Sequence, residues 1–422
     1  MGSYISPFQN RYGTCTMRAI FSDEHRHHIW RDLWYVLALA ENKLGVDIVT
    51  DDKVDEIKKA KYEPIDYDKV MKYENETHHD VVAHLKEFCD HCPTANSILH
   101  LGATSCYITD NADIIIMYNA LSAVLSAIDT TISLLSKIAY KYHDVPLVGR
   151  THLQNAQLTT VGKRVCMWIN DFNIDRDMIR NILSSMKLLG CKCATGSQSS
   201  LYTIFNGDYS KAKELDKFIG NYYGMDVMKI SGQTYTRKYD SIIAGILSQI
   251  AQSASKFATD IRLMSAFGEA FEGFDEKQVG SSAMPYKRNP ITCEKICGIS
   301  RYVICNSQNM AMTASTQWLE RTLDGSSNKR IAMPELFLGI SEVLRCANIV
   351  ARKMVINTDI CVAHANEHSK MASLEDDIII KVMNGCNRQD EHSNAIWSDG
   401  SDDAHINTGF ASQQVINFLH NL

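Results

Sequence analysis

The sequence predicts an all-α protein built around a bundle of long helices. Apolar residues recur at three- and four-residue steps through the middle of the chain, which is the period of an amphipathic helix. No proline interrupts residues 147–284, so long helices are allowed there. Neighbouring pairs such as Ile242–Ile243 and Ile246–Leu247 widen the apolar face, and so wide a face needs partners on several sides. We therefore expect a bundle that other copies of the chain complete.

The first two long helices are expected on either side of Pro146. The first follows the capping residues Thr109 and Asp110 and ends before Pro146. Its apolar positions are Ile114, Met117, Leu121, Val124, Ile128, Ile132, Leu135 and Ile138. The second is expected to run from about Ala156 to Leu189, with Gly190 as its C-terminal stop.

Two further long helices are expected later in the chain. One begins near Tyr235, and the other follows Pro290, a residue that suits the first turn of a helix. The apolar positions of the helix near Tyr235 are Ile242, Ile246, Ile250, Phe257, Ile261 and Met264. These apolar stripes are interpreted as core packing.

The remaining segments are shorter and more polar. An amphipathic helix is expected over Trp30–Leu44, ending at Gly45, and small polar residues over 190–200 predict a turn or short hairpin. The tail after Asn357 is less regular. We expect three domains: an N-terminal helical domain at 1–104, a central bundle at 105–356 and a shortened C-terminal helical domain at 357–422.

Composition excludes several classes of protein. The 422 residues are 45% hydrophobic and 22% charged, which is ordinary for a globular protein. A net charge of −6 argues against non-specific nucleic-acid binding. No run of about 18 apolar residues predicts a membrane span, and the N-terminus has no secretory pattern. The 13 cysteines are an odd count in helical segments, which favours a reducing, cytoplasmic location.

The most specific motif is the serine loop, Gly280–Pro290, with the sequence Gly-Ser-Ser-Ala-Met-Pro-Tyr-Lys-Arg-Asn-Pro. Glycine followed by serines favours a flexible polar loop, and Pro285 and Pro290 restrict the residues before them to extended shapes. Such a loop could place Lys287 against an anionic ligand. A basic surface loop has the same composition, and the residues alone do not distinguish Ser281 from Ser282.

Two more segments carry candidate chemistry. Thr151-His152-Leu153-Gln154 is expected just before a long helix, where a histidine can exchange protons near neutral pH. The run Arg321–Arg330 holds two arginines and several hydroxyls, and planar guanidinium groups suit phosphate or carboxylate. Taken alone, the first could be a structural histidine and the second a solvated charged turn.

Two clusters contain metal-ligand residue types. They are His25-Arg26-His27-His28 and Cys89-Asp90-His91-Cys92. A single Cys-x-x-Cys without a second pair is a weak indication of zinc, so we expect no metal.

The serine loop, the His152 segment and the Arg321–Arg330 run together resemble the fumarase/aspartase superfamily, and most closely its adenylosuccinate lyase branch. The resemblance extends from about Arg11 to Glu335. It implies a three-domain helical fold and a homotetramer in which three subunits build each active site. It also implies that no cofactor is needed.

The resemblance further implies roles for individual residues. His152 would be the general acid, oriented by Glu294. Ser281 would be the base, and Lys287 would neutralise the charge that develops on the substrate, against which His79 lies. The residues that the resemblance assigns to substrate contacts are Arg11, Tyr12, His78, Asp80, Thr104, Ser105, Thr151, Gln233, Asn289, Arg321, Ser326 and Arg330.

This chain departs from the pattern of the family at four of these segments. Asn155 replaces a proline beside His152, and Gly325 replaces an aspartate in the arginine-rich run. Arginine is usual in the family where this chain has His78, and frequent where it has Lys295. A lysine keeps the charge but loses the two-pronged geometry of the guanidinium group.

The implied reaction is a β-elimination that converts adenylosuccinate into AMP and fumarate, and the family also splits the succinylated carboxamide ribotide of purine synthesis. Three alternatives stay open. The chain could belong to the argininosuccinate lyase or fumarase branch, although Tyr286-Lys287-Arg288 and Arg321–Arg330 argue against this. It could be an inactive structural homologue, like the superfamily members that serve as lens proteins. It could also be a metal-dependent helical protein using the His25 or Cys89 cluster.

Overall fold

The computed structural model describes residues 3–275, 277–279, 281–284, 286–396 and 398–422. The chain divides into two compact units, each assembled from segments that are distant in sequence. Unit 1 comprises the chain up to Leu125 together with Met178–Ser248 and Val303–Ser341. Unit 2 comprises Ser126–Asp177, Gln249–Tyr302 and Glu342–Leu422.

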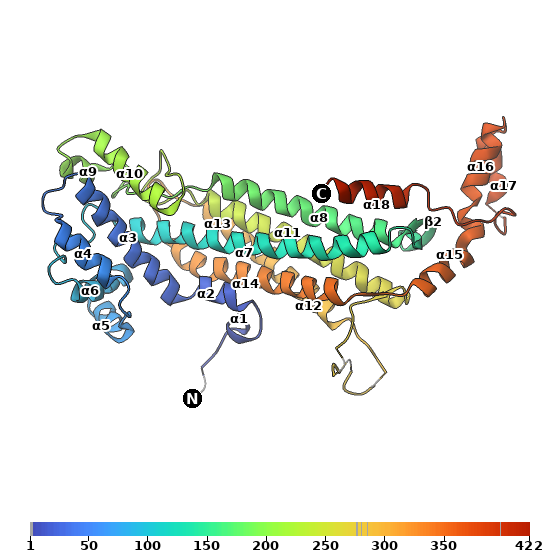
Figure 1. Cartoon of the computed structure of the whole chain (residues 1–422), viewed down its shortest axis with the longest axis horizontal. Coiled ribbons are helices and arrows are strands. Elements are labelled where there is room, and N and C mark those ends of the chain that lie inside the picture. The colour runs from blue at the N-terminus through green and yellow to red at the C-terminus, as the bar shows by residue number, and fades with distance from the viewer. Residues whose placement is uncertain (1–2, 276, 280, 285, 397) are drawn as a thin grey trace. The chain divides into compact units, whose positions relative to one another are not determined.

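Five long helices contribute residues to both units, and they can be followed in Figure 1. They are α7 (Ser105–Lys141), α8 (Val161–Ser185), α11 (Lys238–Ala266), α12 (Ile291–Asn306) and α14 (Asp324–Lys353). The expected all-α bundle is therefore confirmed, including the helix that follows Pro290.

Side-chain contacts hold the long helices together within each unit. In unit 1, Lys329 on α14 forms an ion pair of 2.5 Å with Asp113 on α7. In unit 2, the indole N–H of Trp168 on α8 donates to Asp260 on α11 at 2.6 Å. Around these polar contacts the helices bury their apolar stripes, which supplies the main stabilisation of a bundle.

Helix α7 is longer than the sequence predicts. It begins at Ser105, so Thr109 and Asp110 lie in its second turn and are not its caps. The expected apolar positions are fully buried from Ile114 to Leu135, in a helix that is rich in apolar residues elsewhere too. By length and composition alone α7 could cross a membrane, but the core helix of a soluble protein passes the same test.

The wide apolar face predicted for α11 is mostly covered within the chain. Ile243 and Leu247 are completely buried, and Ile246 is 7% exposed. Ile242, at the start of the stripe, remains 38% exposed.

Shorter helices complete unit 1. They are α1 (Pro7–Asn10), α2 (Cys15–Ile20), α3 (Asp23–Lys43), α4 (Asp51–Ala60), α5 (Tyr67–Thr77), α6 (Asp80–His91), α9 (Ser199–Ile204), α10 (Tyr209–Tyr223) and α13 (Gln308–Ser315). Helix α3 contains the predicted helix and starts earlier, because the Ser22 hydroxyl accepts the His25 N–H at 3.2 Å and caps it. It ends before Gly45, whose φ of +78° suits glycine.

Unit 2 holds the strands and the C-terminal helices. They are β1 (Pro146–Thr151), β2 (Gln154–Thr160), β3 (Ala270–Phe271), β4 (Val355–Ile356), α15 (Thr358–Ala372), α16 (Leu374–Met383), α17 (Arg388–Ala395) and α18 (Ala411–His420). Strands β1 and β2 form an antiparallel hairpin, and β3 pairs with β4 in the same sense.

The predicted helix over 156–189 is wrong at both ends. Its first residues belong to β2, where Leu158 pairs with Val148 of β1, and α8 begins only at Val161. Cross-strand pairing, which short-range periodicity does not reveal, decides the structure of this segment. Helix α8 ends at Ser185, several residues before Gly190.

The segment 190–200 forms the predicted turn at residues 193–195, and its first four residues are buried. Cys191 and Cys193 are buried, and the Gly190 N–H donates to the Asn111 side chain at 3.0 Å. Gly190 does adopt a left-handed φ of +78°. Residues 190–193 therefore belong to the core of unit 1, whereas Ala194, Thr195 and Ser197 are exposed. The three-domain division at 104 and 356 stays a prediction, since the two units are defined by contacts and not by consecutive sequence.

Candidate active site

A cavity of about 1010 Å³ lies in unit 1. Its wall is formed by α3, by the turn between α5 and α6, by α7, α13 and α14, and by the segment just before α11 (Lys238–Ala266). Seven of the predicted site residues line it, and all come from unit 1: His78, His79, Asp80, Ser105, Arg321, Ser326 and Arg330. A volume of this size suits a small-molecule ligand.

The turn between α5 and α6 brings three of these residues to the cavity. His78 ends α5 with a left-handed φ of 51°, and His79 caps α6 by accepting the Val82 N–H on Nδ1 at 3.4 Å. Because Nδ1 accepts, the proton of a neutral His79 sits on Nε2. That nitrogen lies 3.4 Å from the Ser105 hydroxyl, at the first residue of α7.

Arg330 reaches this cluster from α14. Its guanidinium group forms an ion pair with the Asp80 carboxylate. Burial raises the pKa of Asp80, but the hydrogen bond and charge of Arg330 outweigh burial, so the pKa lies below its usual value. Asp80 is therefore ionised at neutral pH, and it orients Arg330 at the cavity wall.

Arg321 and Gln233 form a second pair at the cavity. The Arg321 guanidinium donates to the Gln233 side-chain oxygen at 2.7 Å, and the Gln233 N–H donates to the Glu320 carbonyl at 3.0 Å. Ser326 follows in the first turn of α14. Gly325, where the family has aspartate, also lines the cavity, and a Cβ there would lie 2.8 Å from the Thr313 methyl group.

Sequence reasoning missed an aromatic wall of the cavity. The rings of His27 and His84 lie 3.8 Å apart, and Trp30 packs edge-on against both. Burial lowers the pKa of His27 to about 3 and that of His84 to about 4. Both rings are therefore neutral at pH 7. His27 belongs to the cluster His25-Arg26-His27-His28, whose residue types suggest a metal site. The sequence does not indicate that the His27 ring contacts His84 on α6.

Sequence reasoning also missed a network of charged residues that line the cavity. Asp110 pairs with Arg237 at 3.1 Å, and Asp113 pairs with Lys329 and with Arg26. Burial raises the pKa of Asp113, but the charges of Lys329 and Arg26 outweigh it and leave the pKa below its usual value. The available signal was the spacing of Asp110 and Asp113, one turn apart on the same face of a helix.

Four predicted contact residues of unit 1 do not line this cavity: Gln233, whose partner Arg321 does line it, and Arg11, Tyr12 and Thr104. Arg11 and Tyr12 follow α1, where the guanidinium of Arg11 lies 5.8 Å from the ring of Tyr12. Thr104 precedes α7, and its carbonyl accepts the Tyr107 N–H at 2.9 Å.

His152 lies in unit 2, at the turn of the β1–β2 hairpin. His152 and Leu153 form a two-residue turn between Thr151 and Gln154, with φ angles of 54° and 59°. Hairpin turns of this kind favour glycine and asparagine, because other residues are strained at positive φ. His152 is exposed at this turn.

The described part of the serine loop also lies in unit 2. The Ser281 hydroxyl oxygen accepts the N–H groups of Ala283 at 3.3 Å and Met284 at 3.1 Å. The Lys287 N–H donates to the Met284 carbonyl at 3.0 Å, and the Asn289 carbonyl accepts the Ile291 N–H. The sequence predicts that Gly280 makes the loop flexible and that Pro285 restricts the residue before it. Both residues lie outside the described residues.

Glu294 is in the first turn of α12 and is exposed. Among the described residues of the single chain, its carboxylate forms no hydrogen bond with His152, so the proposed pairing of the two is not made within this chain. Lys295, the neighbouring departure from the family, lies 3.6 Å from the buried carboxylate of Glu342.

Within the described ranges, no group of three or more His, Cys, Asp or Glu side chains is arranged to hold a metal ion. Burial raises the pKa of Cys89 to about 11 and that of Cys92 to about 12.

Comparison with known proteins places this site in a family. A profile of the family described as "Lyase" matches residues 11–305. The adenylosuccinate lyase of Schizosaccharomyces pombe is 39% identical over 393 residues, which cover 93% of this chain and 82% of that protein. The adenylosuccinate lyase of Saccharomyces cerevisiae is 38% identical over 394 residues, covering 92% and 81%.

A solved structure shows the same fold. The crystal structure of fumarate lyase from Mesorhizobium sp. BNC1 superposes with a TM-score of 0.84 and covers 100% of both chains at 20% sequence identity. Fold and profile together define an all-α lyase of the fumarase/aspartase superfamily. Within that class, the chain belongs to the adenylosuccinate lyase family, as its identity to the two yeast enzymes shows.

Proposed function

We propose that this protein cleaves adenylosuccinate to AMP and fumarate, and that it also cleaves the succinylated carboxamide ribotide of purine synthesis. The observation that carries the proposal is the 39% identity to a protein named adenylosuccinate lyase across 93% of this chain. It is a carbon–nitrogen lyase, and its chain presents a cavity with two arginines for an anionic nucleotide.

The cavity of unit 1 supports the binding half of this function. Arg321, Ser326 and Arg330 provide two guanidinium groups and a hydroxyl on one wall, which suit a phosphate. His79 and Ser105 lie next to Arg330 through Asp80, so the succinyl end would meet the turn between α5 and α6. Arg11, Tyr12, His78, Thr104, Thr151, Gln233 and Asn289 are proposed as further substrate contacts.

The segments of unit 2 support the chemical half. Ser281, as an alkoxide, would remove a proton from the succinyl carbon, and Lys287 would stabilise the doubly charged carboxylate that forms. The electron pair left on carbon becomes the double bond of fumarate as the carbon–nitrogen bond breaks. His152, oriented by Glu294 of another chain, would give its proton to the departing nitrogen.

We also propose a cytoplasmic homotetramer in which different subunits share each active site. The described cavity is lined by residues of unit 1 and by none of His152, Ser281, Lys287 or Glu294. If other chains supply those residues, the exposure of His152 and Glu294 in the single chain is explained.

Fumarate release tests the proposal most simply. Purified protein should release fumarate and AMP in equal amounts from adenylosuccinate, and fumarate from the succinylated ribotide. Argininosuccinate and malate, incubated in parallel, should remain unchanged. Cleavage of argininosuccinate alone would assign the chain to another branch, and no turnover of any substrate would favour an inactive structural homologue.

A further inference from the structure

A short segment of unit 2, Glu269–Glu272, places one buried carboxylate at each end of strand β3. Glu269 is completely buried and Glu272 is 3% exposed. Between them, Ala270 and Phe271 pair with Ile356 and Val355 of β4. Two carboxylates are removed from water only when other groups compensate them, so the partners of each show what the segment holds in place.

Glu269 holds the hairpin that carries His152. Both of its oxygens accept hydrogen bonds from the guanidinium of Arg150, at 2.8 and 3.1 Å. Only Thr151 separates Arg150 from the turn. The Arg150 guanidinium also stacks on the ring of Phe267, 4.0 Å from its centre. A planar, two-pronged pair fixes direction as well as distance, so Glu269 sets the orientation of the strand that ends in the turn.

Two more side chains, an arginine and a histidine, lie close to the same carboxylate. The Arg164 guanidinium lies 3.9 Å from Glu269, and His364 of α15 lies 3.2 Å from it. On the other strand of the hairpin, His368 contacts the Ala156 carbonyl at 2.8 Å. Side chains outside the hairpin therefore contact both of its strands. Glu269 is the carboxylate that binds strand β1, through Arg150.

Glu272 holds the base of the serine loop. One oxygen accepts the Thr292 N–H at 3.0 Å and the other accepts the Cys293 N–H at 2.8 Å. These are N–H groups of the first turn of α12, which have no partner inside the helix, and Glu294 is the next residue. Glu272 therefore joins the two ends of the stretch that contains Ser281 and Lys287.

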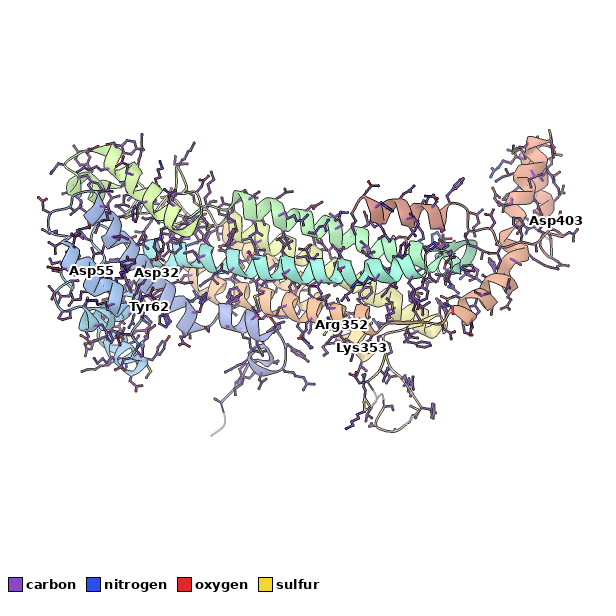
Figure 2. All side chains as sticks on the ribbon, in the orientation of Figure 1. Asp32, Asp55, Tyr62, Arg352, Lys353 and Asp403 are labelled. Atoms are coloured by element: carbon purple, nitrogen blue, oxygen red, sulfur yellow. The ribbon has the colours of Figure 1, made fainter. Side chains whose placement is uncertain are left out.

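The start of that stretch is fixed at two further points. Gly273 has a φ of +77°, and a Cβ there would lie 2.2 Å from the Lys353 carbonyl oxygen. Asp275 forms an ion pair of 2.5 Å with the Lys353 side chain, which Figure 2 shows at the end of α14, beside the stem of the loop. These two contacts restrict the backbone that follows Glu272.

We propose that Glu269 and Glu272 are positioning residues of the lyase reaction: Glu269 orients the hairpin that presents His152, and Glu272 fixes the stem of the loop that presents Ser281 and Lys287. The inference rests on the proposed function. Neither carboxylate touches substrate, and both act through the segments they hold. One four-residue segment thereby sets the geometry of both proton-transferring groups.

The test compares Glu269→Gln and Glu272→Gln with two matched controls in unit 1. Glu87→Gln changes another buried Arg–Glu ion pair, with Arg31 at 2.6 Å, and Asp208→Ala removes another helix cap, at α10. Both Gln variants should lower kcat by about 10²-fold with KM nearly unchanged, because misplacing a reacting group by about 1 Å has this effect. The controls should lower the thermal midpoint but leave kcat within about twofold of wild type, the range expected when no transition-state contact is lost.

A second measurement separates loop positioning from general destabilisation. Trypsin should cut after Lys287 or Arg288 faster in Glu272→Ala than in wild type or Asp208→Ala, at equal distance below each thermal midpoint. If Glu269→Gln does not fold, Arg150→Lys tests the role of Glu269 instead. Lysine keeps the positive charge but cannot form the two-pronged pair with Glu269.

The outcomes distinguish this inference from the proposed function. The positioning roles would be overturned if the wild type is active and the Glu269 and Glu272 variants match the controls in kcat and in trypsin sensitivity. Wild type without lyase activity would instead remove the proposed function. In that case the trypsin comparison still decides whether Glu272 fixes the loop.

Discussion

At the scale of single residues, Ser281 shows how a weak base could act. A serine hydroxyl gives up its proton only when the alkoxide is stabilised. In this chain the Ser281 oxygen already accepts the N–H groups of Ala283 and Met284, and these two donors would strengthen as negative charge develops. Ser282 has no such donors among the described contacts, and the role of Ser281 as base stays a proposal.

Ser281→Ala should lower kcat by roughly 10³-fold while substrate binding remains measurable, because only the proton-removing group is lost. Ser282→Ala is the matched control, and it should retain most of the activity. Steady-state fumarate release and equilibrium binding of adenylosuccinate to each variant measure the two effects. Equal turnover by Ser281→Ala and wild type would exclude the role as base.

Glu41 is a residue whose effect is on stability. It is completely buried on α3, and neither carboxylate oxygen has a hydrogen-bond partner in the described structure. Burial raises the pKa of Glu41 from 4.5 to about 9. A carboxyl whose pKa is raised on folding stabilises the folded state least at high pH. Its contribution is present below pH 4.5 and is lost as the pH rises toward 9.

Glu41→Leu should therefore stabilise the protein by about 2 kcal/mol at pH 8.5, because it removes an unpaired polar group from the core. The gain should be smaller at pH 5, where the wild-type carboxyl is protonated in the native state without a large penalty. Urea unfolding at both pH values measures the difference. A gain that is absent at pH 8.5, or equal at the two pH values, would contradict the assignment of a buried, protonated Glu41.

At the scale of elements, the long helices could be predicted and the hairpin could not. The apolar stripe from Ile114 to Leu135 predicts a helix from nearby residues alone, because its members recur at the three- and four-residue steps of one helix face. Residues 154–160 become a strand because Pro146–Thr151 lies opposite them, and that pairing is not encoded in their own period. The error placed His152 before a helix when it forms a turn.

The candidate site divides in the same way. His79, Ser105, Arg321 and Arg330 were identified through motifs, and the structure brings them to one cavity. His27, His84, Arg237 and Lys329 also line that cavity, but no motif predicted their contacts there. Those contacts form only when segments that are distant in sequence pack together. Sequence patterns found the groups that resemble a family, and packing supplied those that surround them.

The strained turn of the hairpin leads to a prediction at this scale. Leu153 holds a φ of 59° and its side chain is 60% exposed, so little packing offsets the strain. Leu153→Asn should raise stability by about 1 kcal/mol, the approximate penalty for a left-handed residue that asparagine largely avoids. Thermal unfolding of the variant measures this. A lower midpoint than wild type would show that Leu153 makes contacts that matter more than its backbone strain.

At the scale of the whole molecule, the two units separate the predicted site into a binding half and a chemical half. Unit 1 holds the cavity with Arg321 and Arg330, whereas unit 2 holds His152, Ser281 and Glu294 on a hairpin, a loop and a helix end. The proposed tetramer gives a physical reason for this division, because residues exposed in one chain can complete the site of another.

Mixing inactive variants tests this central claim most directly. Ser281→Ala and His152→Ala proteins should each be nearly inactive alone, and subunit exchange between them should be verified by mass spectrometry of the mixed oligomers. The account predicts that fumarate release from adenylosuccinate then rises well above that of either parent, because some hybrid sites contain both intact groups. Verified exchange without any recovery of activity would contradict it.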